Sequence, residues 1–260
     1  MANEVGGVGD PRDRGTRALA IVRGTWQWLL ARAPFLLALG GIQYLILSTI
    51  AMMLYPGGTK YDPATPGYLF WNNMISDMGR TIAHDGTPNA PSCILFICAM
   101  ITLAVIFIPF YIALSECLKT SARAKRPATA AAILGIGTAV LLALAAAFPQ
   151  DLFPLLHLRL AQFSFVALAP SIIIYRWLVK GVRDFPRPCA PAFLVFAIII
   201  ITGIVVTIAS GPGIDAVTVT IQATTQKIMV YSWNVLMPIE GWGLWKMKGR
   251  RAAEMPSFGR

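Results

Sequence analysis

The sequence has little charge. Only 13% of its 260 residues are Asp, Glu, Lys or Arg, and 56% are hydrophobic. A soluble domain has about 25% charged and about 45–50% apolar residues, so the composition excludes an ordinary soluble domain. Acidic residues are the scarcer kind, with 12 Asp and Glu against 22 Lys and Arg. Because these basic residues lie between long apolar runs, they form no dense basic face, and we expect no nucleic-acid partner.

The sequence also lacks the motifs of the common enzyme and cofactor classes. It has no Gly-rich phosphate loop, no Gly-x-Ser-x-Gly motif and no haem-attachment motif. Its two histidines exclude a three-histidine site, and no pair of candidate ligands has a metal-binding spacing. The four cysteines lie within or at the ends of apolar runs, where we expect them to pack as small apolar side chains. We therefore predict no metal and no cofactor, and the sequence leaves open whether the protein is an enzyme.

Long apolar runs are what the sequence has in abundance. A helix needs about 20 apolar residues to cross a membrane. Six runs meet this length, and none alternates with the two-residue period of a barrel strand. We therefore predict an all-α, polytopic, multi-pass membrane protein with six transmembrane helices. The predicted spans are Ala33–Tyr55, Ser92–Glu116, Ala128–Phe148, Leu155–Leu178, Cys189–Ser210 and Ala223–Trp245.

The basic residues predict an orientation. Of the 22 Lys and Arg, 18 lie in residues 1–32, 117–127, 176–187 and 246–260, which are on one side of a six-span bundle. Cytoplasmic loops are rich in Lys and Arg, so we expect both termini in the cytoplasm of a bacterial inner membrane. The predicted organisation is a cytoplasmic segment 1–32, a six-helix domain 33–245 and a cytoplasmic tail 246–260. Within the first segment, Ile21–Arg32 is expected to lie along the inner membrane surface as an amphipathic lead-in.

The loop Pro56–Pro91, on the outer side, carries a polar segment. At 100° per residue, residues 68–80 place Trp71, Met74 and Met78 on one side and polar residues on the other. This pattern predicts a short amphipathic helix at the outer membrane face. Its polar side is either a solvated helix surface or part of a binding site, and both readings stay open. The polar residues are Asn72, Asn73, Ser76, Asp77 and Arg80.

Three titratable residues within the predicted spans lie on the same outer side, namely His157, Arg159 and Lys227. A charged group in hydrocarbon costs about 2.5–3.5 kcal/mol, so it faces protein or water unless it reaches the headgroups. We predict that these residues and the loop helix enclose a polar pocket for a lipid or amphiphile headgroup. If chemistry occurs there, Asp77 and His157 are the candidate acid–base pair. The predicted ligand-binding residues are Asn72, Asn73, Ser76, Asp77, Arg80, His157, Arg159 and Lys227.

Several of these residues carry a resemblance to a known family. The string Tyr55-Pro56-Gly57-Gly58, the segment Asn72–Gly79 and Pro88-Asn89 resemble a prokaryotic family of six-helix membrane proteins, the domain of unknown function 998. His157 with Phe163, and Gln226-Lys227 followed by Trp233, are similar to its later landmarks. The loop pattern is also similar to the related Frag/DRAM group. The resemblance, over about residues 35–248, implies a six-helix fold in a membrane.

Two other functions remain open from the sequence. Trp-rich helix ends and an Ala-rich third span would suit a non-catalytic accessory subunit of a larger membrane-protein complex. A small-solute transporter is a further alternative, although no inverted repeat is present. The expected partners are therefore membrane lipids or other membrane proteins.

Overall fold

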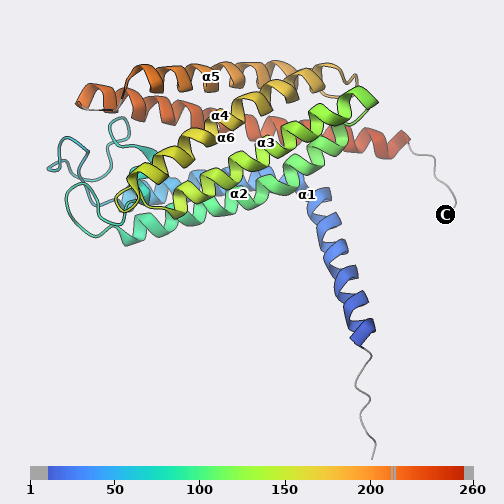
Figure 1. The fold of residues 1–260 in the computed structure, drawn as a ribbon, viewed down its shortest axis with the longest axis horizontal. Coiled ribbons are helices and arrows are strands. Elements are labelled where there is room, and N and C mark those ends of the chain that lie inside the picture. The colour runs from blue at the N-terminus through green and yellow to red at the C-terminus, as the bar shows by residue number, and fades with distance from the viewer. Residues whose placement is uncertain (1–10, 212, 214, 255–260) are drawn as a thin grey trace, which may run out of the picture.

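The computed structural model describes residues 11–211, 213 and 215–254, and over these the chain is helical and has no β-strand (Figure 1). This confirms the all-α prediction. The helices are α1 Pro11–Leu54, the short 3-10 helix η1 Ile75–Gly79, α2 Ala90–Leu118, α3 Ala122–Ala147, α4 Pro154–Lys180, α5 Cys189–Ala209 and α6 Ala216–Glu254.

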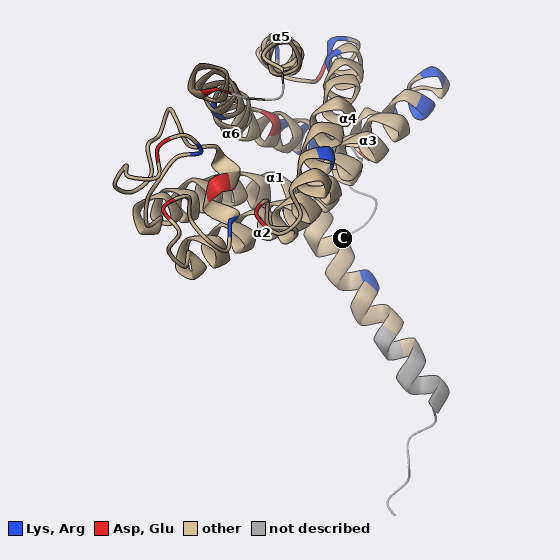
Figure 2. Ribbon diagram, turned by 60° about the vertical axis from the view of Figure 1, so that its left-hand side comes forward, with Lys and Arg blue, Asp and Glu red and all other residues tan. Residues whose placement is uncertain are grey.

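Successive long helices run antiparallel and pack on their neighbours in the chain, and α6 returns to pack on α1 and α2. Three connections therefore gather at one end of the bundle, which we call the loop end. They are residues 55–89 between α1 and α2, residues 148–153 between α3 and α4, and the connection between α5 and α6. Most charged residues lie at the helix ends and in the connections (Figure 2).

Five of the described helices, α1 to α5, are long and apolar enough to cross a membrane. These helices make the chain a multi-pass membrane protein. The sixth predicted span, 223–245, lies within α6, which is long enough but carries Lys227, Glu240 and several amide side chains. Five spans are therefore supported by length and apolarity, and the count of six remains a prediction.

Helix α1 is continuous but changes direction, and its N-terminal part leaves the bundle (Figure 1). Pro34 explains a bend, because proline has no N–H to donate to the carbonyl four residues earlier. That carbonyl belongs to Leu30, and Lys248 of α6 donates a hydrogen bond to it. The predicted lead-in Ile21–Arg32 thus lies within the part of α1 that precedes this bend. Its placement along a membrane surface remains a prediction.

The core of the bundle combines aromatic rings with small residues. Phe107 of α2 stacks on Trp233 of α6, with ring centroids 4.8 Å apart, and on Tyr111, which in turn stacks on Tyr175 of α4. Gly135 of α3 lies against the Tyr111 ring so closely that a Cβ would be 2.7 Å from it. The small-residue side of α3 is therefore what lets α2 approach, as small residues do between membrane helices.

The predicted amphipathic helix over residues 68–80 is wrong in extent. Only Ile75–Gly79 is helical, as η1, and all five of its residues are buried. The preceding turn is held by Asn73, whose carboxamide oxygen accepts from Leu69 N–H at 2.8 Å. An Asn side chain that bonds nearby backbone in this way competes with helix formation. The η1 residues are folded into the loop end, while Asn72 remains on the exposed side of the loop.

Candidate functional site

A cleft of about 540 Å³ opens at the loop end, between the loop 55–89 and the first turns of α4 and α6. We call it the loop-end cleft. Its loop side carries the titratable side chains Lys60, Asp77, Arg80 and His84. The opposite side carries the apolar residues Pro154, Leu155 and Leu158 of α4, with Gln150, Met74, Val219 and Gln222 completing the lining. The cleft therefore joins a charged wall to an apolar one.

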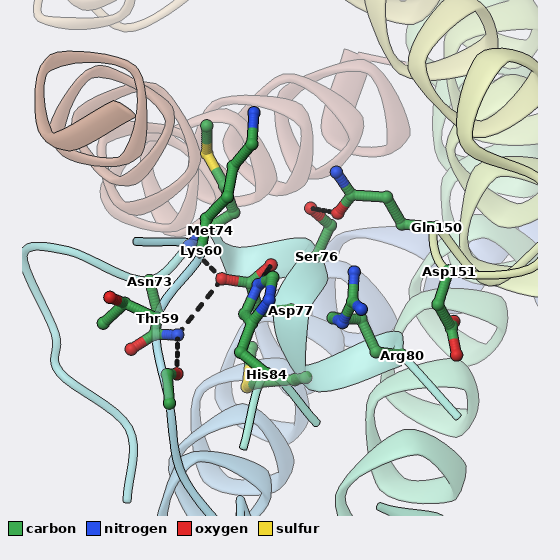
Figure 3. A network of polar contacts seen from close by, with 12 residues as sticks. Thr59, Lys60, Asn73, Met74, Ser76, Asp77, Arg80, His84, Gln150 and Asp151 are labelled. Atoms are coloured by element: carbon green, nitrogen blue, oxygen red, sulfur yellow. Dashed lines mark hydrogen bonds and ion pairs between the residues drawn. The ribbon is translucent and has the colours of Figure 1, made fainter. Parts of the chain in front are cut away.

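Asp77 is the most constrained residue of the charged wall. Its side chain is almost fully buried, and its Oδ2 accepts from the Met74 N–H at 2.8 Å and from the Asn73 amide at 3.2 Å (Figure 3). Its Oδ1 lies 3.2 Å from His84 Nε2. Asn73 is itself fully buried and also donates to the Gly58 carbonyl at 2.9 Å. The carboxylate is thus fixed from several sides, with one oxygen directed to the histidine.

His84 reaches Asp77 because the two ends of the loop approach closely. The His84 N–H donates to the Tyr55 hydroxyl at 3.1 Å, and the Asp85 N–H donates to the Gly57 carbonyl at 3.2 Å. A Cβ at Gly58 would lie 2.5 Å from the Asp85 nitrogen, and the Gly58 φ of +80° is one that side chains rarely adopt. Glycine at position 58 is therefore a condition for bringing His84 to the carboxylate.

Two cations complete the charged wall. Lys60 donates to the Gly213 carbonyl at 2.8 Å, and Arg80 uses its Nε–H to donate to the Ile82 carbonyl at 3.0 Å. A guanidinium has five N–H donors in a fork that suits an oxyanion. The Arg80 Nε–H is therefore occupied in holding the side chain, while the end of the guanidinium is the part suited to a ligand in the cleft.

Lys227, predicted to bind a ligand, is instead fully buried between α6 and the loop. Its ammonium donates to the Asn73 carbonyl and lies 5.5 Å and 5.3 Å from the ring centroids of Tyr68 and Phe70. The Tyr68 phenol donates to the Met74 carbonyl at 2.8 Å, and burial raises its pKa well above the usual value, which favours the protonated form. Because its ammonium bonds to the Asn73 carbonyl of the loop, Lys227 fastens the loop to α6 from beneath the cleft.

His157, predicted as the acid–base partner of Asp77, does not pair with it. Its Nδ1 lies 2.8 Å from the Ala145 carbonyl and 3.0 Å from the Phe148 carbonyl, at the end of α3. Since carbonyl oxygens only accept, Nδ1 carries the proton and caps that helix. The residue that pairs with Asp77 is His84, seven positions along the chain.

Arg159, predicted to share the pocket, lies on another face of α4. Its guanidinium donates to Gln162 at 3.2 Å. Both side chains border a separate groove of about 280 Å³ that is lined mostly by apolar residues of α4 and α5, together with Met229 of α6. Arg159 and Gln162 are three residues apart on α4 and therefore share a face, which is not the face that carries His157.

The other predicted residues divide between the cleft and its surroundings. Asn72 donates to the Thr220 hydroxyl at 3.1 Å on the exposed side of the loop. Ser76 donates to Gln150 at 3.2 Å, and Gln150 lines the cleft (Figure 3). Ser76 and His157 also border a smaller cavity of about 60 Å³ inside the bundle, beneath η1. Of the eight predicted residues, Asp77 and Arg80 line the loop-end cleft itself.

Sequence reasoning missed an anchor in the connection between α3 and α4. Asp151 accepts from the N–H groups of Thr81 and Ile82 at 3.0 Å and from the Thr81 hydroxyl. Burial opposes ionisation of this carboxyl, but the hydrogen bonds outweigh it and hold its pKa below the usual value. The signal was the polar pair Gln150-Asp151 in a connection otherwise made of Pro, Phe and Leu.

A bundle of long apolar helices that encloses a polar loop at one end defines a helical, multi-pass membrane protein. Within that class, the chain matches the family described as "Protein of unknown function (DUF998)" over residues 49–237, and it belongs to this family. The match spans every residue that lines the loop-end cleft. No curated protein and no solved structure matches the chain. The resemblance predicted from the loop motif is confirmed, while similarity to the Frag/DRAM group and a prokaryotic origin remain predictions.

Proposed function

We propose that the loop-end cleft binds the anionic headgroup of a membrane lipid or amphiphile at the outer face of the membrane. The observation that supports this most is the joining of two walls in one cleft of about 540 Å³. One wall carries Lys60 and Arg80, and the other carries the apolar side chains that begin α4.

The charged wall suits an anion. Lys60 and Arg80 outnumber the carboxylate of Asp77, whose oxygens are already engaged by Asn73, Met74 and His84. Hydrogen bonds between a guanidinium or ammonium and a phosphate are about twice as strong as neutral ones. A phosphate headgroup with a net negative charge, without a cationic group to offset the phosphate, is therefore the ligand that this wall favours.

The apolar wall suits a lipid tail. Leu155 and Leu158 lie on the first turns of α4 and are 65% and 47% exposed. α4 is one of the helices able to span a membrane, and its first turns stand at the loop end. An amphiphile placed with its phosphate toward Arg80 would lay its chain along these leucines. Each Å² of apolar surface that is removed from water in this way favours binding by about 25 cal/mol.

The basic residues support the proposed orientation of the bundle in the membrane. The end opposite the cleft carries most of the Lys and Arg, and basic loops remain in the cytoplasm. The cleft would therefore open to the outer face, where membrane lipids are its natural partners.

A binding comparison of two lipids tests the proposal. The full-length protein is reconstituted in nanodiscs that contain either phosphatidylglycerol or phosphatidylcholine, and retained lipid is measured by native mass spectrometry. We expect preferential retention of phosphatidylglycerol and a reduction of about tenfold in Arg80→Gln, because a hydrogen bond to a charged group contributes about 1.5–3 kcal/mol.

Arg159→Gln is the matched control. It removes the same charge from the same end of the bundle but outside the cleft, so retention should match the wild type. Equal retention of the two lipids by the wild type, or equal losses in the two variants, would contradict a headgroup site in the cleft.

A further inference from the structure

We propose that His84 and Asp77 form a catalytic pair that hydrolyses a carboxylic ester of the amphiphile bound in the loop-end cleft. The inference rests on the proposed headgroup site and adds a reaction to it. It arises from an arrangement of three groups that line one cleft, namely an imidazole, the carboxylate behind it and a guanidinium beside it.

The carboxylate is placed to orient the imidazole. Asp77 is only 4% exposed, and its Oδ2 is occupied by the Met74 N–H and the Asn73 amide. Its Oδ1 is left to accept from His84 Nε2 at 3.2 Å (Figure 3). A carboxylate that accepts from one ring nitrogen fixes the tautomer and leaves the other nitrogen, here Nδ1, with a lone pair.

The imidazole is placed where a ligand can reach it. The His84 side chain is 14% exposed, against 5% for the Asp77 side chain, and both line the cleft. The base therefore stands at the surface of the cleft, and the group that orients it stands behind. This is the order that general-base catalysis requires, with the orienting carboxylate shielded and the base in reach of water.

The loop motif supports this pair. Tyr55 accepts from the His84 backbone, and Gly57 and Gly58 permit the close approach of residues 84–85. Asn73 braces the carboxylate from the other side. Residues from three separate parts of the loop thus converge on one histidine–aspartate contact.

The reaction needs only water. His84 Nδ1 takes a proton from a water molecule, and the water oxygen bonds to the ester carbonyl carbon. The Arg80 guanidinium has N–H groups beyond those that hold the phosphate, and these offset the negative charge that develops on the carbonyl oxygen. The bond from that carbon to the alkoxide then breaks, and the proton passes from His84 to the alkoxide. The products are a carboxylic acid and an alcohol, without an oxidant or a cofactor.

The two walls of the cleft indicate the substrate class. In a glycerophospholipid the ester bonds lie between the phosphate and the acyl chains. A molecule held by its phosphate at Lys60 or Arg80, with its chain along Leu155 and Leu158, would place an ester between these walls, facing His84 of the charged wall. The substrate is therefore an anionic phospholipid, and hydrolysis would release a fatty acid.

The experiment uses phosphatidylglycerol with a fluorescent acyl chain, presented in mixed micelles to the purified full-length protein. Release of the labelled fatty acid is followed by thin-layer chromatography. We expect His84→Ala to lower the rate about 10²–10⁴-fold, which is the contribution of a general base. Millimolar imidazole should restore part of the rate in this variant, because a small base can occupy the space that the side chain leaves. Arg159→Gln should hydrolyse the probe at the wild-type rate.

Asp77 is a positioning residue in this scheme, and Asp77→Asn tests that role. The amide keeps the size of the side chain, so we expect kcat to fall and KM to stay within about twofold of the wild type. A structural role alone would change KM and folding together. Folding is checked by the temperature at which the buried thiols of Cys93 and Cys189 react with a dye.

The outcomes separate this proposal from the headgroup site. Retention of phosphatidylglycerol together with release that depends on His84 supports both. Retention without release by the wild type overturns the hydrolysis and leaves the headgroup site standing. Undiminished release by a folded His84→Ala, or a rate that imidazole does not raise, also overturns it. Failure of the wild type to retain the lipid overturns the headgroup site first.

Discussion

The loop 55–89 and the helix bundle beneath it are stabilised by different interactions. In the loop, buried polar side chains bond to backbone groups, as Asn73 does to Gly58 and Leu69, and Asn89 to Met78 and Arg80. In the bundle, aromatic rings stack and small residues let helices approach, as at Phe107, Trp233 and Gly135.

The difference shows where each part of the chain tolerates change. A hydrogen-bonded loop depends on the identity of single residues, since a buried polar group that loses its partner costs about 1–3 kcal/mol. A packed apolar interior depends on volume, and swaps of similar size usually cost less than about 1.5 kcal/mol. Substitutions should therefore have larger effects in the loop than in the bundle.

Gly58→Ala should give the largest effect. The left-handed backbone at φ +80° costs alanine about 1–2 kcal/mol, and the new Cβ would meet the backbone of residues 84–85 at 2.5–2.6 Å. We expect a loss of about 3 kcal/mol, measured by thermal unfolding with a thiol-reactive dye. The control is Gly67→Ala, where φ is +63° but no heavy atom lies within 4 Å of a Cβ. It should cost about 1 kcal/mol, and equal losses at the two positions would contradict the close approach at Gly58.

Lys227→Met should have the next largest effect. Methionine can fill the apolar surroundings of Tyr68 and Phe70, but it leaves the Asn73 carbonyl without its ammonium donor. We expect a loss of about 2 kcal/mol in the same unfolding assay. Arg159→Met removes a basic residue of the same end from an exposed position and should leave the unfolding temperature unchanged. A larger loss of unfolding free energy in Arg159→Met than in Lys227→Met would contradict the assignment of Lys227 as the residue that anchors the loop.

The contrast between these two basic residues shows how far the sequence could predict the site. Hydropathy is local along the chain, so the predicted span Leu155–Leu178 differs from α4 by one and two residues at its ends. What the sequence could not supply were contacts across many residues. Lys227 meets a carbonyl 154 positions away, and no period indicates that partner.

The pairing of Asp77 was unpredictable for a related reason. The helix expected over residues 68–80 would have kept Asp77 on a surface, facing the other outer-side residues. Instead, the Asn73 side chain accepts from the Leu69 N–H and holds a turn in place of a helix. Gly57 and Gly58 then allow residues 84–85 to approach, so that His84 meets the carboxylate. The conformation of such a loop depends on hydrogen bonds from side chains to backbone and on close approaches of backbone segments. Neither leaves a periodic pattern in the sequence.

Gly135→Ala tests the bundle side of the comparison. The new methyl would press on the Tyr111 ring at 2.7 Å, and overpacking of this kind costs about 1–3 kcal/mol, offset by about 1 kcal/mol of helix propensity. We expect a net loss of about 1 kcal/mol in the unfolding assay. Gly137→Ala, two residues along α3, meets nothing within 4 Å and should be neutral or slightly stabilising. A cost at Gly137 as large as at Gly135 would contradict packing on Tyr111 as the cause, because a Cβ at Gly137 meets no neighbour and alanine favours the helix.

Asp151→Asn should give the smallest effect, and one that depends on pH. The carboxylate holds Thr81 and Ile82 and is only partly buried, so solvent screening limits its contribution to less than about 1 kcal/mol. Its pKa is lowered on folding, because hydrogen bonds favour the charged form more than burial opposes it. The contribution is therefore complete above the unfolded value of about 3.9 and is lost as the pH falls through the lower folded pKa. Unfolding temperatures of wild type and Asp151→Asn should differ at pH 7 and converge at acid pH. A difference that persists unchanged into acid would mean that Asp151 holds the loop through its shape and not through its charge.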